Sequence, residues 1–373
     1  MTSWDAIYGV SRDRKEGIIM NHLKKIAAKL DAYGIDAMLV NSEPGEFYAI
    51  GFHGEGNVVV TKEGCYYFTD SRYIEAANDL VTDAQITMTD RSRNYKAMVQ
   101  EVIDRHGIKK LGFEDAYLSV ADYNGWKEGL TAELVPAQAI INDLRATKDE
   151  EELARMRKAQ DITDAAFTAI CKYIKPGMTE QEIAARLQYE MLCLGAEKMS
   201  FDPIVASGPN GSKPHAIPSD KKVELGEFIT MDFGCKFGGY CSDMTRTVAL
   251  GEPTEEMRKV YDTVLQAQLA GIAAAKAGVP GQVIHNAAAK VIEDAGYGAY
   301  FGHGFGHSVG IEIHESPNAN HSNEKPMPEG CAVSAEPGIY LPGQFGVRIE
   351  DVIIYRADGS ENITHSPKEL IIL

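Results

Sequence analysis

Five residues in the C-terminal half carry side chains that can ligate divalent metal ions: Asp232, Asp243, His307, Glu336 and Glu350. In chain order they lie in the motifs MDFG, SDMTRT, GFGHSVG, SAEPGIY and GVRIED. The four carboxylates would balance two divalent cations, and oxygen-rich ligation with one imidazole suits Mn(II), Co(II) or Fe(II) better than a thiolate-type zinc site does. Two such ions roughly 3.5–4 Å apart would lower the pKa of a bridging water and polarise the bond under attack. This residue set therefore predicts hydrolysis.

Two of the carboxylates, Asp232 and Asp243, are expected on one face of a β-hairpin. Residues 228–234 and 240–248 alternate as strands do. A turn centred on Phe237-Gly238 would place the aspartates directly opposite each other, with Cβ atoms roughly 4.5–5.5 Å apart. A turn one residue later would make them diagonal neighbours on the same face. Like charges this close destabilise a sheet unless a cation neutralises them, although a solvated pair on an exposed face is the common alternative.

The two glutamates lie in apolar segments. Glu350 shares a strand face with Arg348 within residues 347–354, and a buried acid there needs a partner. Arg348 is placed to hold one of the carboxylates by a bidentate pair. Glu336 ends an apolar run that a Pro-Gly pair stops. Asp351, on the opposite strand face, is expected to be an ordinary exposed charge.

Three histidines, His303, His307 and His314, are spaced by four and seven residues around a glycine-rich segment, 301–310. The glycines permit close backbone approach, and their spacing differs from that of a dinucleotide-binding loop. Any one histidine alone is more often structural, but three together indicate metal binding or proton handling. As donors to a developing oxyanion they favour amide cleavage. His215, in a Pro-His pair before the hairpin, is counted with them.

The elements that must position these residues follow a charged boundary near residues 145–152. Beyond it, helix signals run towards Ile174, from Thr179 with a capping box to Glu182, over 254–277 and over 282–294. Each helix pair precedes strand-like segments that carry candidate ligands. This loose duplication predicts a domain, 146–373, built of two similar halves with the site between them.

Residues 1–145 alternate helix and strand signals, which indicates a smaller α/β domain. Apolar spacing predicts helices over 12–33, from Ser71 and over 95–106, and strands at 37–40, 57–61, 65–69, near Ile86 and at 111–113.

Composition excludes several classes of function. Of the 373 residues, 44% are hydrophobic and 24% charged, which is ordinary for a globular protein. The formal net charge of −17 repels nucleic acids and anionic membranes. No segment approaches the roughly 20 apolar residues of a membrane span, and the N-terminal residues show no signal-peptide core. The six cysteines form no metal-type spacing. We therefore expect a cytoplasmic protein with reduced thiols.

Taken together, the motifs resemble those of the M24 metallopeptidases, which include aminopeptidase P and prolidase. The resemblance runs from about residue 150 to the end, through PHAIPSD, TMDFG, YCSDMTRT, GHGFGHSVGIEIHE, EPGIY and GVRIED. Within the N-terminal part, residues 68–73, FTDSRY, most clearly resemble the family's creatinase-type N-terminal domain. The resemblance implies an α/β (α+β) chain in which a pita-bread catalytic domain, 146–373, follows a creatinase-type domain, 1–145.

The resemblance also implies a ligand arrangement for two divalent ions, most simply Mn(II), with Co(II), Fe(II) or Zn(II) as alternatives. Asp232 would hold one ion, and His307 and Glu336 the other. Asp243 and Glu350 would bridge both.

Catalytic and substrate-binding roles follow from the same resemblance. Glu336 would shuttle the proton of an attacking hydroxide that bridges the metals. His314 would stabilise the tetrahedral intermediate. His215 and His303 would line the substrate site near the scissile bond, with Arg348 as a further substrate-binding candidate. The expected substrates are peptides with proline in second position, and the expected assembly is a homodimer.

The substrate length is open between two family activities. Prolidases often carry an arginine shortly after the His-Glu pair, where it holds the carboxylate of an Xaa-Pro dipeptide. Residues 314–318 here read HESPN, without one, which favours an aminopeptidase that acts on longer peptides. A methionine aminopeptidase normally lacks a domain like residues 1–145 and ranks third.

Other classes of protein fit the sequence less well. A creatinase-like hydrolase or a non-catalytic peptide-binding scaffold of the same fold would be expected to have lost ligands, and all five are present. A phosphohydrolase would be expected to add basic clamps for phosphate. Near the ligands only Arg246 and Arg348 are basic, and each is expected to pair with a carboxylate.

Overall fold

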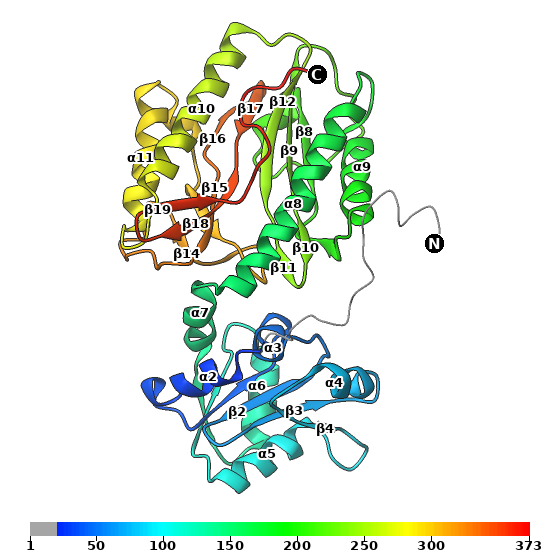
Figure 1. The fold of residues 1–373 in the computed structure, drawn as a ribbon, viewed down its shortest axis with the longest axis vertical. Coiled ribbons are helices and arrows are strands. Elements are labelled where there is room, and N and C mark those ends of the chain that lie inside the picture. Colours follow the sequence, from blue (N-terminus) through cyan, green and yellow to red (C-terminus); the bar gives the residue numbers. More distant parts are fainter. Residues whose placement is uncertain (1–20) are drawn as a thin grey trace. The chain divides into compact units, whose positions relative to one another are not determined.

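The computed structural model describes residues 21–373, and the chain divides into two compact units, Met1–Arg145 and Ala146–Leu373 (Figure 1). The start of the predicted helix 12–33 lies outside the described residues. Its described part holds α2 (Leu23–Lys29) and a 3-10 turn (Asp31–Tyr33). Gly34 follows with a φ of 65°, a conformation that glycine adopts without strain. No helix among the described residues is long and apolar enough to cross a membrane.

The N-terminal unit is built on a six-stranded mixed sheet of order β4-β3-β2-β1-β5-β6. Its strands are β1 (Ala37–Val40), β2 (Asn57–Thr61), β3 (Cys65–Thr69), β4 (Gln85–Met88), β5 (Lys110–Phe113) and β6 (Glu133–Pro136). Its helices are α3 (Glu43–Ile50), α4 (Ile74–Leu80), α5 (Tyr95–His106), α6 (Val120–Gly129) and α7 (Gln138–Ala146), which runs one residue past the unit boundary. Apolar residues of α5, with Trp126 of α6, pack against Leu39, Val59 and Phe68 of the sheet. The sequence interpretation predicted five of these strands and missed β6, α3, α6 and α7.

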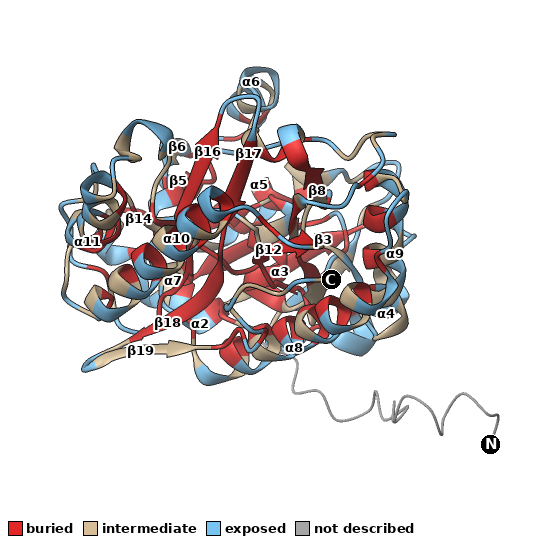
Figure 2. Ribbon diagram, turned by 90° about the horizontal axis from the view of Figure 1, so that it is seen from above, coloured by how far each residue is buried: buried red, intermediate tan, exposed pale blue. Residues whose placement is uncertain are grey.

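The C-terminal unit contains two helix pairs, each packed on an antiparallel sheet (Figures 1 and 2). In the first half, α8 (Glu150–Tyr173) and α9 (Glu180–Cys193) cover the sheet β12-β9-β8 and share a buried core with it. In the second half, α10 (Glu255–Ala274) and α11 (Gly281–Asp294) share a core with the sheet β14-β13-β15-β18-β19. The expected pairing of helices and strands is thus observed in both halves.

The strands of this unit are β7 (Lys198–Met199), β8 (Ile204–Ser207), β9 (Glu227–Phe233), β10 (Cys235–Phe237), β11 (Tyr240–Cys241), β12 (Met244–Leu250), β13 (Gly306–Ser308), β14 (Glu315–Ala319), β15 (Ala332–Ala335), β16 (Gly338–Leu341), β17 (Phe345–Arg348), β18 (Asp351–Arg356) and β19 (Gly359–Asn362). One expectation is corrected here: the strand predicted over 347–354 is broken between Arg348 and Asp351. At the break, Glu350 donates its backbone N–H to the carbonyl oxygen of Thr245 on β12 at 3.0 Å. The break therefore places Glu350 beside the first-half sheet.

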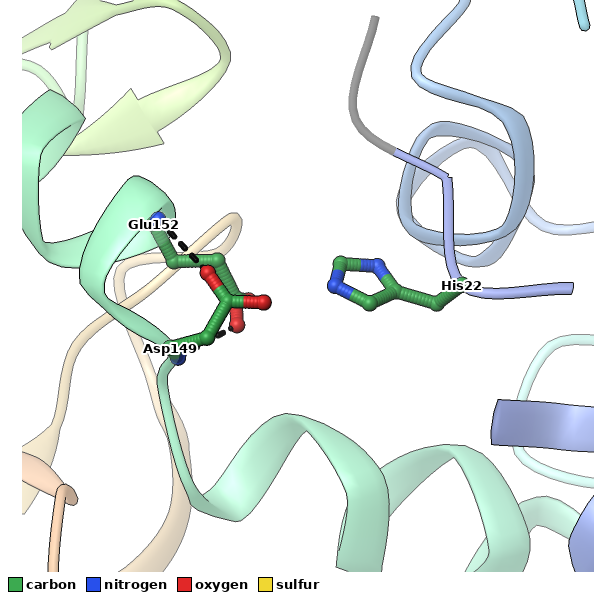
Figure 3. Close-up of side chains that lie close together, drawn as sticks. All are labelled: His22, Asp149 and Glu152. Atoms are coloured by element: carbon green, nitrogen blue, oxygen red, sulfur yellow. Dashed lines mark hydrogen bonds between the residues drawn. The ribbon is translucent and has the colours of Figure 1, made fainter. Parts of the chain in front are cut away.

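Capping boxes begin both helices of the first half. At α8 the Asp149 carboxylate accepts the backbone N–H of Glu151 and of Glu152, and the Glu152 carboxylate accepts the backbone N–H of Asp149 at 2.8 Å (Figure 3). His22, also drawn there, belongs to the N-terminal unit, where its Nδ1 donates to the Tyr48 carbonyl oxygen at 2.8 Å. The box predicted at Thr179 for α9 is also confirmed.

Candidate active site

A cavity of about 1050 Å³ in the C-terminal unit brings the predicted site residues together. Its lining includes all nine of them: Asp232, Asp243, His307, Glu336, Glu350, His215, His303, His314 and Arg348. Carboxylates and imidazoles thus share this cavity with apolar side chains, of which Phe201, Pro203, Ile204, Ile217 and Tyr300 are examples.

The hairpin that carries the two aspartates turns at Gly238-Gly239, where both residues have positive φ, 57° and 79°. In the ladder between β9 and β12, Thr245 lies opposite Asp232. Asp243 is therefore a diagonal neighbour of Asp232 on the same face, which is the later-turn alternative of the sequence analysis. The side chain opposite Asp232 is a threonine hydroxyl instead of a second negative charge.

His307 faces the carboxylates through its Nε2 atom, which lies 3.6 Å from Asp243 Oδ2 and 3.4 Å from Glu336 Oε1. Its Nδ1 contacts the Ser308 carbonyl oxygen at 3.2 Å, which requires Nδ1 to carry the proton. The unprotonated Nε2 then points its lone pair at the acids, as a metal ligand does. The Ser334 hydroxyl connects His307 with Glu336. It accepts the His307 backbone N–H and donates to Glu336 Oε1, each at 3.0 Å.

Burial sets the charge behaviour of this cluster. Desolvation, reinforced by the neighbouring carboxylates, raises the pKa of Asp243 and of Glu350 well above the usual range. Desolvation also raises the pKa of Glu336, although the nearby His303 and Arg348 lower it in part. Burial lowers the pKa of His307 and thus favours its neutral form. The cluster needs a cation to keep these acids ionised.

The donor set fits divalent cations. One ligand atom from each of Asp243, His307 and Glu350 lies within 4.8 Å of the other two. The buried Oδ1 of Asp232 has no hydrogen-bond partner among the described residues, which is rare for a buried carboxylate oxygen. Oxygen-rich donors with one neutral imidazole are the ligands that Mn(II)-type ions prefer.

Arg348 is the cationic residue of the cavity lining, and its guanidinium bonds to neighbouring protein groups. Its Nη2 donates to Asp232 Oδ2 at 2.6 Å, and its Nε donates to the Thr245 hydroxyl at 2.9 Å. The predicted pairing with a carboxylate is therefore observed, but through one N–H instead of two. Its Nη1 donates to the Tyr340 hydroxyl at 2.8 Å and to the Pro214 carbonyl oxygen at 3.3 Å.

The other histidines surround the carboxylates. The ring of His314 packs edge-on against His307 with centroids 4.3 Å apart. His303 contacts the Gly304 carbonyl oxygen through Nδ1 at 2.9 Å and the Tyr340 hydroxyl through Nε2 at 3.0 Å, so both of its ring nitrogens are engaged. His215 is exposed at the cavity wall. Burial lowers the pKa of His303 and of His314.

Asp351 corrects an expectation, because it is completely buried instead of exposed. Its carboxylate pairs with Arg246 at 2.8 Å and with Lys368 at 2.7 Å, and these two cations lower its pKa despite the desolvation. The expected pairing of Arg246 with a carboxylate is thus observed. The ion pair between Arg246 and Asp351 holds the start of β18, next to Glu350.

The sequence interpretation missed two side chains that organise the site. Tyr340 lines the cavity, and burial raises its pKa to about 12, so its hydroxyl stays protonated and bonds both His303 and Arg348. Thr245 donates to Glu350 Oε2 at 2.7 Å. Both residues lie in motifs that the sequence analysis singled out, EPGIY and SDMTRT, but a hydroxyl gives no signal of what it will contact.

Comparisons with known proteins agree with this architecture. Residues 154–357 match metallopeptidase family M24, and residues 22–147 match the creatinase/prolidase N-terminal domain. The structure is similar to that of an Xaa-Pro dipeptidase from Bacillus anthracis, with a TM-score of 0.91, 40% identity and coverage of 94% of this chain and 99% of the other. It is also similar to that of an X-Pro aminopeptidase from Thermotoga maritima, with a TM-score of 0.88, 34% identity and coverage of 95% of this chain and 100% of the other. An Xaa-Pro dipeptidase from Pyrococcus horikoshii is 35% identical over 358 residues, 95% of this chain and 99% of that protein.

Proposed function

Because the chain belongs to metallopeptidase family M24 and is a hydrolase of the Xaa-Pro peptidase type, we propose that it releases the N-terminal residue of peptides with proline in second position. Its fold is the creatinase-type N-terminal domain followed by the pita-bread catalytic domain. The preferred substrates in this proposal are longer than dipeptides, as for aminopeptidase P.

Divalent metal ions belong to this family's chemistry, and five residues would hold them here: Asp232, Asp243, His307, Glu336 and Glu350. When bound, a pair of such ions supplies Lewis-acid polarisation of the scissile carbonyl and activation of water. Mn(II) is the ion we propose, because four of the five ligands are carboxylates.

The chain's own residues carry the proton transfers. Glu336 would accept a proton from the attacking water and deliver it to the imide nitrogen of proline as the C–N bond breaks. Its position among the candidate ligands, with Oε1 3.4 Å from His307 Nε2, suits this exchange. His314, beside the metal-binding cluster, would donate a hydrogen bond to the oxyanion that forms on the carbonyl oxygen. The products are the free N-terminal residue and a peptide that begins with proline.

The preference for longer peptides rests on the charges of the cavity lining. A free dipeptide brings its C-terminal carboxylate into the cavity, where a basic side chain would be needed to pair with it. Among the described lining residues, Arg348 is the one Lys or Arg, and its three nitrogens already bond to Asp232, Thr245, Tyr340 and Pro214. A longer peptide carries its terminal carboxylate farther from the scissile bond and does not need a basic partner there. A cavity of about 1050 Å³ also exceeds what a dipeptide fills.

Three substrates test the proposal on metal-stripped protein with and without Mn(II): Gly-Pro, Gly-Pro-NH₂ and Gly-Pro-Ala. We expect Mn(II)-dependent cleavage of the Gly–Pro bond, with kcat/KM highest for Gly-Pro-Ala. The amide has the size of the dipeptide without its charge, so it should be cleaved faster than Gly-Pro. A higher kcat/KM for Gly-Pro than for both others would instead make the protein a prolidase.

Prolidase is the second candidate, because the relatives from Bacillus anthracis and Pyrococcus horikoshii are named Xaa-Pro dipeptidases, whereas the one from Thermotoga maritima is named an aminopeptidase. No cleavage of any of the three substrates, with Asp243→Ala behaving as the wild type does, would overturn the catalytic proposal. We further propose a homodimer, which sedimentation of the full chain tests.

A further inference from the structure

One buried carboxylate outside the metal-binding cluster has a full set of hydrogen bonds. Glu180, the first residue of α9, is completely inaccessible to solvent. Its Oε1 accepts from the backbone N–H and the hydroxyl of Ser207 at 2.7 and 2.8 Å, and from Asn210 Nδ2 at 3.2 Å. Its Oε2 accepts from the backbone N–H and the hydroxyl of Ser219 at 3.1 and 2.6 Å, and again from Asn210 Nδ2 at 3.2 Å.

These donors hold the two ends of one loop. Ser207 ends β8, Ser219 lies twelve residues farther along the chain, and Asn210 lies between them. The segment 208–218 that they enclose carries His215 and Ile217, which both line the cavity. Ile217 is 85% exposed, so burial of this residue does not hold this part of the loop in place.

The opposite side of the loop is tied to the hairpin β16–β17. The backbones of Gly211 and Gly346 approach so closely that a Cβ on Gly346 would lie 2.0 Å from the Gly211 carbonyl oxygen. The Pro214 carbonyl oxygen accepts from Arg348 Nη1 at 3.3 Å. The loop is therefore held from two directions, and the Glu180 carboxylate provides the charged hydrogen bonds at its two ends, which are the stronger kind.

We propose that Glu180 is a positioning residue, which holds the loop 207–219 against the cavity and thereby places His215 beside the substrate. An ionised carboxylate can accept from all five donor groups at once, whereas an amide in its place would turn two N–H donors towards other donors. The inference rests on the proposed function, in which His215 contacts the peptide, but Glu180 itself lies outside the cavity lining.

Glu180→Gln tests the proposal in the full chain, with two readouts. Hydrogen exchange of the amides in 207–219, followed by mass spectrometry, should become about tenfold faster or more, since bonds to a charged acceptor are lost. In a double-mutant cycle on Gly-Pro-Ala hydrolysis, His215→Ala should lower kcat/KM strongly in the wild type but by less than about threefold in the Glu180→Gln background.

Leu187→Ala is the matched control. Leu187 is buried in the core under the same helix, so its truncation lowers stability without removing a bond to the loop. It should leave exchange in 207–219 and the effect of His215→Ala as they are in the wild type. If Glu180→Gln does not fold, Asn210→Ala and Ser219→Ala each remove part of the bond set and should move both readouts in the same direction to a smaller extent.

Unchanged exchange in 207–219 would overturn the proposal, and so would multiplicative effects of the two substitutions or an absent effect of His215→Ala. Failure of the wild type to cleave any Xaa-Pro peptide is a different result. It would remove the proposed function, and the exchange measurement alone would then decide whether Glu180 holds the loop.

Discussion

Hydroxyl groups that hydrogen-bond to the candidate ligands hold individual carboxylate side chains in place. Thr245 donates to Glu350 Oε2 and accepts from Arg348 Nε, so it connects a candidate ligand to the arginine that pairs with Asp232. Groups that orient metal ligands in this way typically change metal affinity about 10–100-fold when they are removed.

Thr245→Val keeps the shape of the side chain and removes the hydroxyl. We expect Mn(II) affinity, measured by calorimetric titration of metal-stripped protein, to fall about 10–100-fold. Thr247→Val is the control, because Thr247 is also buried on β12 but donates to the Arg348 backbone carbonyl instead of a candidate ligand. Equal Mn(II) affinities of the two variants would contradict this account.

A second residue, Glu46 of the N-terminal unit, gives the protein a pH-dependent stability. Burial raises its pKa from 4.5 to about 7, although Tyr67 and Gly56 donate to it at 2.5 and 3.2 Å. Below about pH 4.5 the folded and unfolded chains both keep the proton. As pH rises towards 7, only the folded chain keeps it, so stability falls and the loss is complete above pH 7.

We therefore expect this unit to be about 3 kcal/mol less stable at pH 8 than at pH 4.5 through Glu46 alone. Denaturant titrations followed by Trp126 fluorescence, in a Trp4→Phe background, measure this difference. Glu46→Gln should remove it. Glu43→Gln should retain most of it, because the Glu43 carboxylate is exposed on the same helix and contributes the smallest of the causes that raise the pKa of Glu46. An unaltered pH dependence in Glu46→Gln would refute the assignment.

Among the elements, the segment before and through β13 brings His307 to the carboxylates by close backbone contact. Gly306 crosses β15 so closely that a Cβ there would lie 1.7 Å from the Ser334 carbonyl oxygen. Ser334 in turn bonds the backbone of His307 and the carboxylate of Glu336. The spacing of these strands therefore requires a glycine at position 306.

Gly306→Ala should force β13 away from β15 and destabilise the catalytic unit by about 3 kcal/mol or more, as overpacking of backbone against backbone does. Gly302→Ala, in the same glycine-rich segment, places its Cβ in open space and should change stability by less than about 0.5 kcal/mol. Thermal unfolding compares the two. Equal melting temperatures would show that the strands can separate without cost.

At the scale of the molecule, the five candidate metal ligands join the two halves of the catalytic unit. Asp232 and Asp243 come from the hairpin of the first half, and His307, Glu336 and Glu350 from the segments of the second. Without a cation, these buried acids must either repel one another or take up protons, and both cost folding free energy. A bound cation removes this cost and links the two halves. The stability of this unit should therefore depend on metal.

Mn(II) at about a hundredfold excess over its Kd should stabilise the metal-stripped protein by about 2.7 kcal/mol. Calorimetry with EDTA and then with Mn(II) measures the shift. Asp243→Asn replaces a buried acid, which must be charged or take up a proton, by a neutral amide. The metal-free variant should therefore melt above the metal-free wild type and gain little from Mn(II). A variant that melts lower than the wild type without metal would contradict this argument.

The candidate ligands, their order in the chain and most of the elements around them could be predicted from the sequence alone. Ligand types and their order are covalent facts, and the strand alternation around Asp232 and the capping box at Thr179 depend on neighbours a few residues away. Such local patterns are readable because the backbone repeats with a short period.

The contacts between groups from distant segments could be identified only in the folded chain. Asp351 was expected to be exposed from its strand face, but it is buried against Arg246, which is 105 residues away in the chain. The hairpin turns at Gly238-Gly239, one residue later than the first alternative, and this turn sets the register of its strands. Tyr340 and Glu180 form hydrogen bonds with residues of other segments of the chain. Contacts between distant segments depend on the packing of whole elements, and no periodicity in one segment encodes them.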